Sequence, residues 1–144
     1  MPKHLHILNG PNLNLLGTRE PAVYGSRNFD DFLEELRLDF PTLTFSYFQS
    51  NVEGEIINSL HQHGFSAHGI LLNAAGFTHT SVAIGDAVAS IKTPVIEIHI
   101  SNIFAREEFR QTSFIAPHAK GVISGFGLES YRLGVLCFVR SVTL

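Results

Sequence analysis

The sequence predicts an α/β fold in which a five-stranded parallel sheet carries helices on both faces. Five short apolar runs rich in Ile, Val, Leu and Phe recur along the chain, which is typical of buried strands. Segments with apolar residues at helical spacing lie between these runs. Because crossovers between parallel strands are long and right-handed, this alternation favours a parallel sheet covered on both sides.

Each element follows from the local pattern. The apolar runs predict strands at residues 5–8, 43–48, 70–72, 95–100 and 122–123, of which the last is the weakest. Helical spacing predicts helices over residues 29–40, 53–63 and 81–91, and a helical stretch over residues 106–110. Residues 128–139 fit a helix or a strand, because Gly134 weakens a helix and residues 136–139 also suit a strand.

Composition restricts the class of protein. A chain of 144 residues has the length of one domain. The net charge of −3 argues against nucleic acid as a partner, because its binding requires clustered positive charge. No apolar run approaches the roughly 20 residues that span a membrane, and the amino end lacks the apolar region of a signal peptide. We therefore expect a cytoplasmic protein that binds neither nucleic acid nor membrane.

Polar residues follow three of the predicted strands, at residues 9–12, 73–76 and 99–102. In an open parallel sheet, ligands bind beyond the carboxyl ends of the strands. Two long connections without clear periodicity, residues 9–27 and 101–120, begin at the same ends, and connections of this length are usually functional or disordered. Amides, hydroxyls and a histidine are thus expected to form one polar pocket.

Glu97 and His99 are two residues apart in the fourth strand, which places both side chains on the same face. Burying them separately would cost several kcal/mol, whereas a Glu–His pair satisfies both groups. In that geometry Glu97 orients His99 and favours its protonated form. The alternative is an edge strand from which both side chains face water.

Arg19 and Tyr24 lie in a segment flanked by Gly and Pro that has the character of a mobile cover over the pocket. A tyrosine acts as a base only as tyrosinate. Lowering its pKa to neutrality requires about 4 kcal/mol, which is what an arginine at about 4 Å supplies at an effective dielectric constant of about 20. The alternative is that Tyr24 is a turn aromatic packed on the surface.

The remaining histidines carry weaker signals. His79 lies just before a predicted helix, where it either contacts a ligand or supports the start of the helix, for which Thr78, Thr80 or Ser81 is the candidate N-cap. The other histidines lack the Cys or carboxylate partners of a zinc site, so no metal site is predicted. Residues 10–12 do not form a Walker or dinucleotide glycine pattern.

The longest motif is at the amino end. Residues 8–17 read Leu-Asn-Gly-Pro-Asn-Leu-Asn-Leu-Leu-Gly, and Arg-Glu-Pro at 19–21 and Tyr-Gly at 24–25 follow. This stretch resembles the amino-terminal signature of type II 3-dehydroquinate dehydratases. Further matches, which extend the resemblance over nearly the whole chain, lie at residues 49–51, 53–55, 73–81, 97–102, 106–107 and 109–110.

Two departures from the family pattern are visible. Ala-Ala-Gly at residues 74–76 stands where the family often has Pro-Gly-Ala, which alters the stiffness of the loop. Gly85 stands where an arginine is common, which we expect to alter a surface charge near the site. Neither departure removes a catalytic group.

The resemblance implies a flavodoxin-like catalytic domain over residues 1–144. Its implied activity is the conversion of 3-dehydroquinate to 3-dehydroshikimate and water by anti elimination through an enolate, in the shikimate pathway and aromatic amino acid biosynthesis. Tyr24 would remove the proton beside the ketone, with Arg19 stabilising the tyrosinate. His99 would protonate the departing hydroxyl, and Glu97 would fix its orientation. This division fits the chemistry, since a weakly acidic C–H needs a base and a leaving hydroxyl needs a proton.

The resemblance also implies the remaining site residues, no metal or organic cofactor, and a homo-oligomer. Arg106 would add positive potential, and Asn12 would hold a water against the enolate oxygen. Asp86 would reach the site from an adjacent subunit, in a dodecamer built from trimers. The residues implied to bind substrate hydroxyls and carboxylate are Asn73, His79, the backbone of Ile100 and Ser101, and Arg110.

Two other functions remain open from the residues. A flavodoxin-like module that binds a nucleotide or flavin phosphate predicts a Ser-, Thr- and Gly-rich loop after the first strand, whereas this loop is rich in Asn, Leu and Pro. An oligomeric structural protein with a vestigial site would tolerate the loss of Tyr24 or His99, yet both are present.

Overall fold

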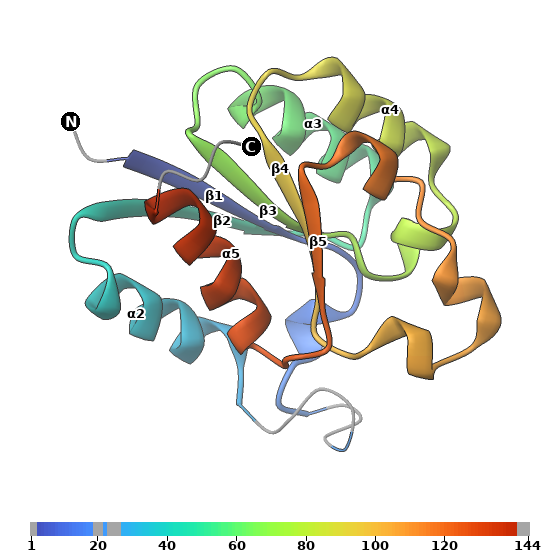
Figure 1. The fold of residues 1–144 in the computed structure, drawn as a ribbon, viewed down its shortest axis with the longest axis horizontal. Coiled ribbons are helices and arrows are strands. Elements are labelled where there is room, and N and C mark those ends of the chain that lie inside the picture. The colour runs from blue at the N-terminus through green and yellow to red at the C-terminus, as the bar shows by residue number, and fades with distance from the viewer. Residues whose placement is uncertain (1–2, 19–21, 23–26, 141–144) are drawn as a thin grey trace.

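The fold is known from a computed structural model that describes residues 3–18, 22 and 27–140 (Figure 1). In this part of the chain a five-stranded sheet has the order β2-β1-β3-β4-β5, and every pair of neighbours is parallel. This order is that of flavodoxin-like folds, so the predicted fold class is confirmed. The strands are β1 (Lys3–Asn9), β2 (Leu43–Gln49), β3 (Gly69–Asn73), β4 (Val95–His99) and β5 (Gly121–Ser124).

Helices cover both faces of the sheet, as Figure 1 shows. Helices α2 (Phe29–Asp39) and α5 (Glu129–Val139) lie on one face, and α3 (Glu53–His63) and α4 (Val82–Ser90) lie on the other. Each face has its own apolar cluster, because the strands of a doubly covered parallel sheet are buried on both sides. The three predicted helices and the five predicted strands are all present, with bounds that differ by at most two residues.

Side-chain caps explain where two helices begin. The side chain of Asn28 accepts a hydrogen bond from the backbone N–H of Asp31 at the start of α2. The hydroxyl of Ser81 accepts one from the N–H of Ile84 at the start of α4. Each cap satisfies a donor that has no partner inside the helix. Of the three candidate caps for α4, Ser81 is therefore the one used.

The sequence left one segment ambiguous and predicted another only in part. Residues 128–139, which fitted either a helix or a strand, form α5, with Gly134 buried in it. The helical stretch predicted over 106–110 is present only in part: residues 108–110 belong to the 3₁₀ helix η4 (Glu108–Gln111), whereas the backbone of Arg106 and Glu107 is extended. The same connection also contains the 3₁₀ helices η3 (Ile103–Ala105) and η5 (Ala116–His118).

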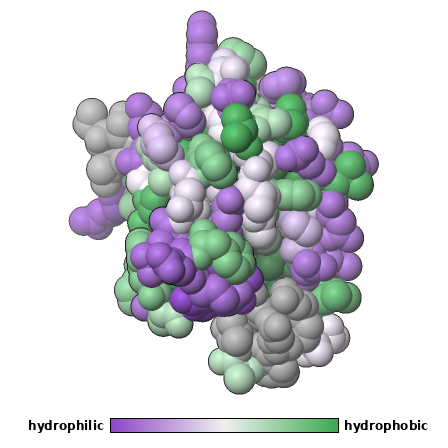
Figure 2. Space-filling model, turned by 90° about the vertical axis from the view of Figure 1, so that its right-hand side faces the viewer, coloured by the Kyte–Doolittle hydropathy of each residue, from purple (hydrophilic) through white to green (hydrophobic). Residues whose placement is uncertain are grey.

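The surface at the right-hand side of Figure 1 carries hydrophilic and hydrophobic residues interspersed with one another (Figure 2). No helix in the described part of the chain is long and apolar enough to cross a membrane.

Candidate active site

A cavity lies at the carboxyl ends of β1, β3 and β4, where the sequence predicted a polar pocket. Eight of the predicted site residues line it: Asn12, Asn73, His79, His99, Ile100, Ser101, Arg106 and Arg110. Residues far apart in the sequence meet here because parallel strands end at the same edge of the sheet.

A close approach of two backbones joins the loops that line this cavity. The N–H of Gly10 donates a hydrogen bond to the carbonyl of Asn73, with an N···O distance of 2.7 Å. A Cβ atom at Gly10 would lie 2.5 Å from the carbonyl oxygen of Ala74, which is closer than non-bonded atoms come. Only glycine therefore allows the loops after β1 and β3 to meet at this point.

Glu97 and His99 form a buried pair on β4. His99 Nε2 lies 2.6 Å from Glu97 Oε2, and the two residues are 4% and 0% exposed. β4 lies between β3 and β5 in the sheet, so the alternative of a water-facing edge strand is wrong. A carboxylate at this distance places a negative charge beside the imidazole and fixes the orientation of its ring.

Ser113 holds the other oxygen of this carboxylate. Its Oγ lies 2.7 Å from Glu97 Oε1 and also accepts hydrogen bonds from the N–H groups of Ile115 and Ala116. A serine oxygen has two lone pairs and one proton, so its proton is directed to Glu97. Both oxygens of Glu97 thus have partners, which is what a buried carboxylate requires.

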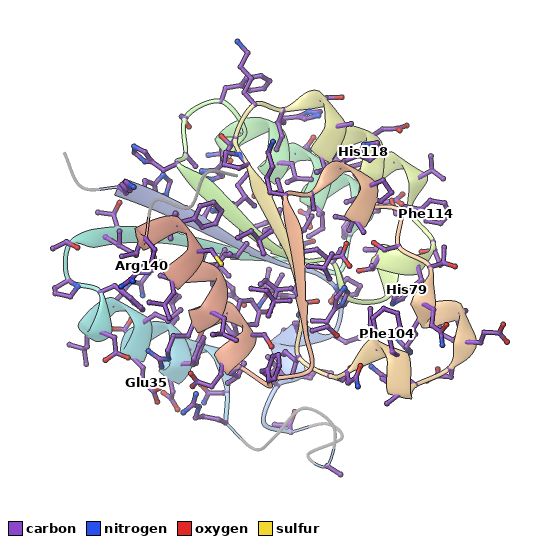
Figure 3. All side chains as sticks on the ribbon, viewed as in Figure 1. Glu35, His79, Phe104, Phe114, His118 and Arg140 are labelled. Carbon is purple, nitrogen blue, oxygen red and sulfur yellow. The ribbon has the colours of Figure 1, made fainter. Side chains whose placement is uncertain are left out.

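His79, labelled in Figure 3, is the last residue of η2 (Ala75–His79), which packs against η4. Its Nδ1 lies 2.7 Å from the carbonyl oxygen of Thr112, and since a carbonyl only accepts, Nδ1 carries a proton. Burial lowers the pKa of His79, against the opposing effect of the Thr112 carbonyl. The neutral ring then has Nε2 as an acceptor, suited to a ligand hydroxyl.

Two arginines add positive charge to the wall. Arg106 Nη1 donates to Ser101 Oγ at 3.1 Å. The guanidinium of Arg110 contacts both carboxylate oxygens of Glu107 at 3.3 Å and lies over the ring of Phe109. The Arg110 hydrogen bond lowers the pKa of the Glu107 carboxyl. Together with the amides, these charges suit a small anionic ligand with hydroxyl groups.

Two non-glycine residues of the cavity wall have left-handed backbone conformations. Asn12 has φ 70° and its N–H donates to Asn51 Oδ1 at 2.9 Å. Ala75 has φ 52°, in the loop where the family often has Pro-Gly-Ala. Such conformations are costly for residues with a Cβ and cluster at functional sites, where the surrounding structure holds them.

Four expectations from the sequence concern residues that do not appear among those lining the cavity. Arg19 and Tyr24 lie outside the described residues. Asp86 is exposed on α4 and does not line the cavity of its own chain. The expectation that Gly85 alters a surface charge is wrong, because Gly85 is buried and a Cβ there would lie 2.3 Å from the backbone oxygen of Phe114. A larger side chain at this position requires a different path of the loop around residue 114.

Sequence reasoning missed three residues that support the site, namely the buried Asn9 and Tyr131 and the half-buried Ser113. Asn9 ends β1 and was treated only as part of a polar loop. Ser113 and Tyr131 are far in sequence from the residues they contact, so no local pattern connects them. Among the described residues, no group of three or more His, Cys, Asp or Glu side chains is placed to hold a metal ion.

Comparison with known proteins assigns the family. The profile of the family Dehydroquinase class II matches residues 3–139. Curated 3-dehydroquinate dehydratases from Prochlorococcus marinus and Gloeothece citriformis are 50% identical over 131 residues and 51% identical over 136 residues. These alignments cover 90% of this chain and 90% of the first relative, and 93% and 90% for the second.

Solved structures agree with this assignment. The type II dehydroquinase from Butyrivibrio crossotus is 36% identical with a TM-score of 0.90, over 96% of this chain and 98% of that one. The enzyme from Propionibacterium acnes is 37% identical with a TM-score of 0.91, over 98% and 99%. The chain therefore belongs to the class II dehydroquinase family.

Proposed function

We propose that this chain is a 3-dehydroquinate dehydratase that forms 3-dehydroshikimate and water by anti elimination through an enolate. The observation that carries the proposal is the buried Glu97–His99 pair, which opens on a cavity lined by amides and arginines in a chain of this family. The reaction belongs to the shikimate pathway and, we propose, serves aromatic amino acid biosynthesis in the cytoplasm. Residues 1–144 act as one catalytic domain.

His99 is the proposed acid. Loss of the substrate hydroxyl as water requires a proton, and an imidazolium paired with Glu97 can supply it. Glu97 keeps the ring in place through Nε2, so Nδ1 is the nitrogen that faces the departing oxygen. The hydrogen bond from Ser113 holds the Glu97 carboxylate in the position that this arrangement needs.

Tyr24 is the proposed base, acting as tyrosinate beside Arg19. It removes the proton next to the ketone, and the electron pair moves to the ketone oxygen to form the enolate. A water held by Asn12 stabilises that oxygen, while Arg106 adds positive potential. Expulsion of the hydroxyl then restores the ketone, now conjugated with the new C=C bond. Proton transfers of this kind need no metal or organic cofactor.

Substrate binding is assigned to groups that line the same cavity. Arg110 pairs with the substrate carboxylate, and the amide of Asn73 and Nε2 of His79 bind hydroxyls. The backbone of Ile100 and Ser101 completes this set. The left-handed backbone conformations of Asn12 and Ala75, and the close backbone contact at Gly10, support a preformed substrate site.

A homo-oligomer, namely a dodecamer built from trimers, is part of the proposal. Asp86 is exposed on α4 and is not a wall residue in its own chain, which is compatible with a contribution to the site of an adjacent subunit. Analytical ultracentrifugation of the wild type and of Asp86→Ala, with turnover measured on the same samples, tests both statements.

The deciding experiment is an ultraviolet assay on the purified protein, because the conjugated product absorbs where 3-dehydroquinate does not. We expect turnover by the wild type and a loss of orders of magnitude in Tyr24→Phe, which keeps the ring and removes the base. A colourless protein is expected; a yellow protein without turnover would favour the flavin-binding alternative, which none of the matched relatives supports.

A further inference from the structure

A buried hydrogen-bonded network behind the cavity joins three elements that are distant in sequence. Tyr131 of α5 donates its hydroxyl proton to Asn9 Oδ1 of β1, with an O···O distance of 2.7 Å. Asn73 Nδ2 of β3 lies 2.9 Å from the same hydroxyl oxygen. The exposed fractions of Tyr131, Asn9 and Asn73 are 0%, 0% and 3%, so water does not compete for these bonds.

The direction of each bond follows from the chemistry of the groups. A phenol has one proton, and the carbonyl oxygen of Asn9 can only accept it. The hydroxyl oxygen of Tyr131 must then accept a proton from Asn73 Nδ2. Burial raises the pKa of Tyr131, so the hydroxyl keeps its proton.

This arrangement selects one of the two orientations of the Asn73 amide. Nδ2 faces Tyr131, and Oδ1 accepts the backbone N–H of Ala75 at 3.1 Å. A flipped amide would set Oδ1 against a hydroxyl oxygen that has no proton left to give. One amide proton and one lone pair of Asn73 remain for the cavity that it lines.

The ring of Tyr131 is itself held in place. The rings of Phe29 and Tyr131 meet edge to face with centroids 4.9 Å apart, and Phe32 lies 6.1 Å away. Because the ring cannot move, the hydroxyl is delivered to a fixed point behind the cavity. The core between α2, α5 and the sheet therefore supports the wall of the site.

We propose that Tyr131 is a positioning residue for the dehydration, because its hydroxyl fixes the Asn73 amide in the orientation that binds a substrate hydroxyl. The inference rests on the proposed function and concerns a residue that does not itself touch the substrate. Misalignment of one hydrogen-bonding group would weaken substrate binding more than it slows the chemical step.

The test compares Tyr131→Phe with Tyr47→Phe. Tyr47 is the matched control because its hydroxyl accepts from Asn9 Nδ2 at 3.4 Å, in the same network but without contact to Asn73. We expect Tyr131→Phe to raise KM about five- to tenfold, with kcat changed less than about twofold. Tyr47→Phe should leave both constants near those of the wild type. Unchanged KM in a folded Tyr131→Phe protein would overturn the proposal.

A measurement on the wild type covers the case in which Tyr131→Phe does not fold. The side-chain amide signal of Asn73 in ¹⁵N-labelled protein is assigned by its loss in Asn73→Asp. One of its two protons should exchange with solvent far more slowly than those of the exposed Asn58. Fast exchange of both protons would refute the assignment whatever the enzyme does. Absence of turnover in the wild type would instead refute the proposed function alone.

Discussion

His99 and His6 are both buried histidines on strands of one sheet, yet their partners differ. His99 is 4% exposed and pairs with the carboxylate of Glu97. His6, on β1, is 1% exposed, and its two ring nitrogens bond to the hydroxyls of Ser46 and Ser59 at 2.6 and 2.8 Å. The imidazole of His99 thus lies beside a negative charge, whereas that of His6 lies between neutral hydroxyl groups.

The surroundings of His6 change the pKa of its ring. Burial, and then the neighbouring His63 and His4, lower the pKa of His6 to about 3. The rings of His6 and His63 are stacked with centroids 3.7 Å apart, which makes an added charge still less favourable. Burial beside neutral hydroxyls and other histidines thus keeps the His6 imidazole neutral. A buried histidine that is to donate a proton needs a carboxylate beside it.

The largest effect is expected from His99→Ala. Removing the proposed acid should lower kcat about 10³-fold, measured by the ultraviolet assay at pH 7. His6→Gln, which replaces the histidine that lacks a carboxylate, should keep turnover within about threefold of the wild type if the two regions differ as described. Comparable losses of kcat in both variants would contradict the proposed difference between His99 and His6.

The pH dependence of stability is the second prediction and concerns His6. Its folded pKa of about 3 lies below the 6.5 of an ordinary histidine, so between these values the unfolded chain binds the extra proton. The stability contribution is therefore fully present above pH 6.5 and is lost as the pH falls toward 3. We expect a loss of about 2–4 kcal/mol in urea denaturation between pH 7 and pH 4.

Two variants sharpen this measurement. His6→Gln keeps hydrogen-bonding atoms but cannot be protonated, so its stability should depend less on pH over this range. His61→Gln, at an exposed position of α3, should retain the dependence of the wild type. If His6→Gln showed the full dependence, the titrating group would have to lie elsewhere.

The smallest effect is expected from Ser113→Ala. The variant removes the proton donor to Glu97 Oε1 and should lower kcat about tenfold, because a hydrogen bond to a charged group contributes about 1.5–3 kcal/mol. Ser130→Ala is the matched control, since Ser130 Oγ also accepts a loop N–H, that of Phe126, whereas Ser113 Oγ in addition donates to Glu97 Oε1. Equal kinetic losses in the two variants would show that Ser113 acts only on the loop.

Much of the fold was predictable because the spacing of apolar residues along the chain indicates most of its strands and helices. Apolar periodicity predicted the strands and α2, α3 and α4 within one or two residues, since burial on a sheet face constrains residues at regular spacing. The prediction for 106–110 was only partly right, because residues 108–110 are helical in η4 whereas the backbone of Arg106 and Glu107 is extended. Residues 128–139 stayed ambiguous because an apolar run suits either a helix or a strand.

The sequence by itself determined that Glu97 and His99 share one face of a strand, since side chains two residues apart on a strand point the same way. It also determined that polar strand ends would gather at one edge of the sheet. Only the tertiary structure decided that Ser113 orders Glu97 and that Tyr131 holds Asn73. Those contacts join residues 16 and 58 positions apart, and such pairs become neighbours only when the sheet and its helices have packed.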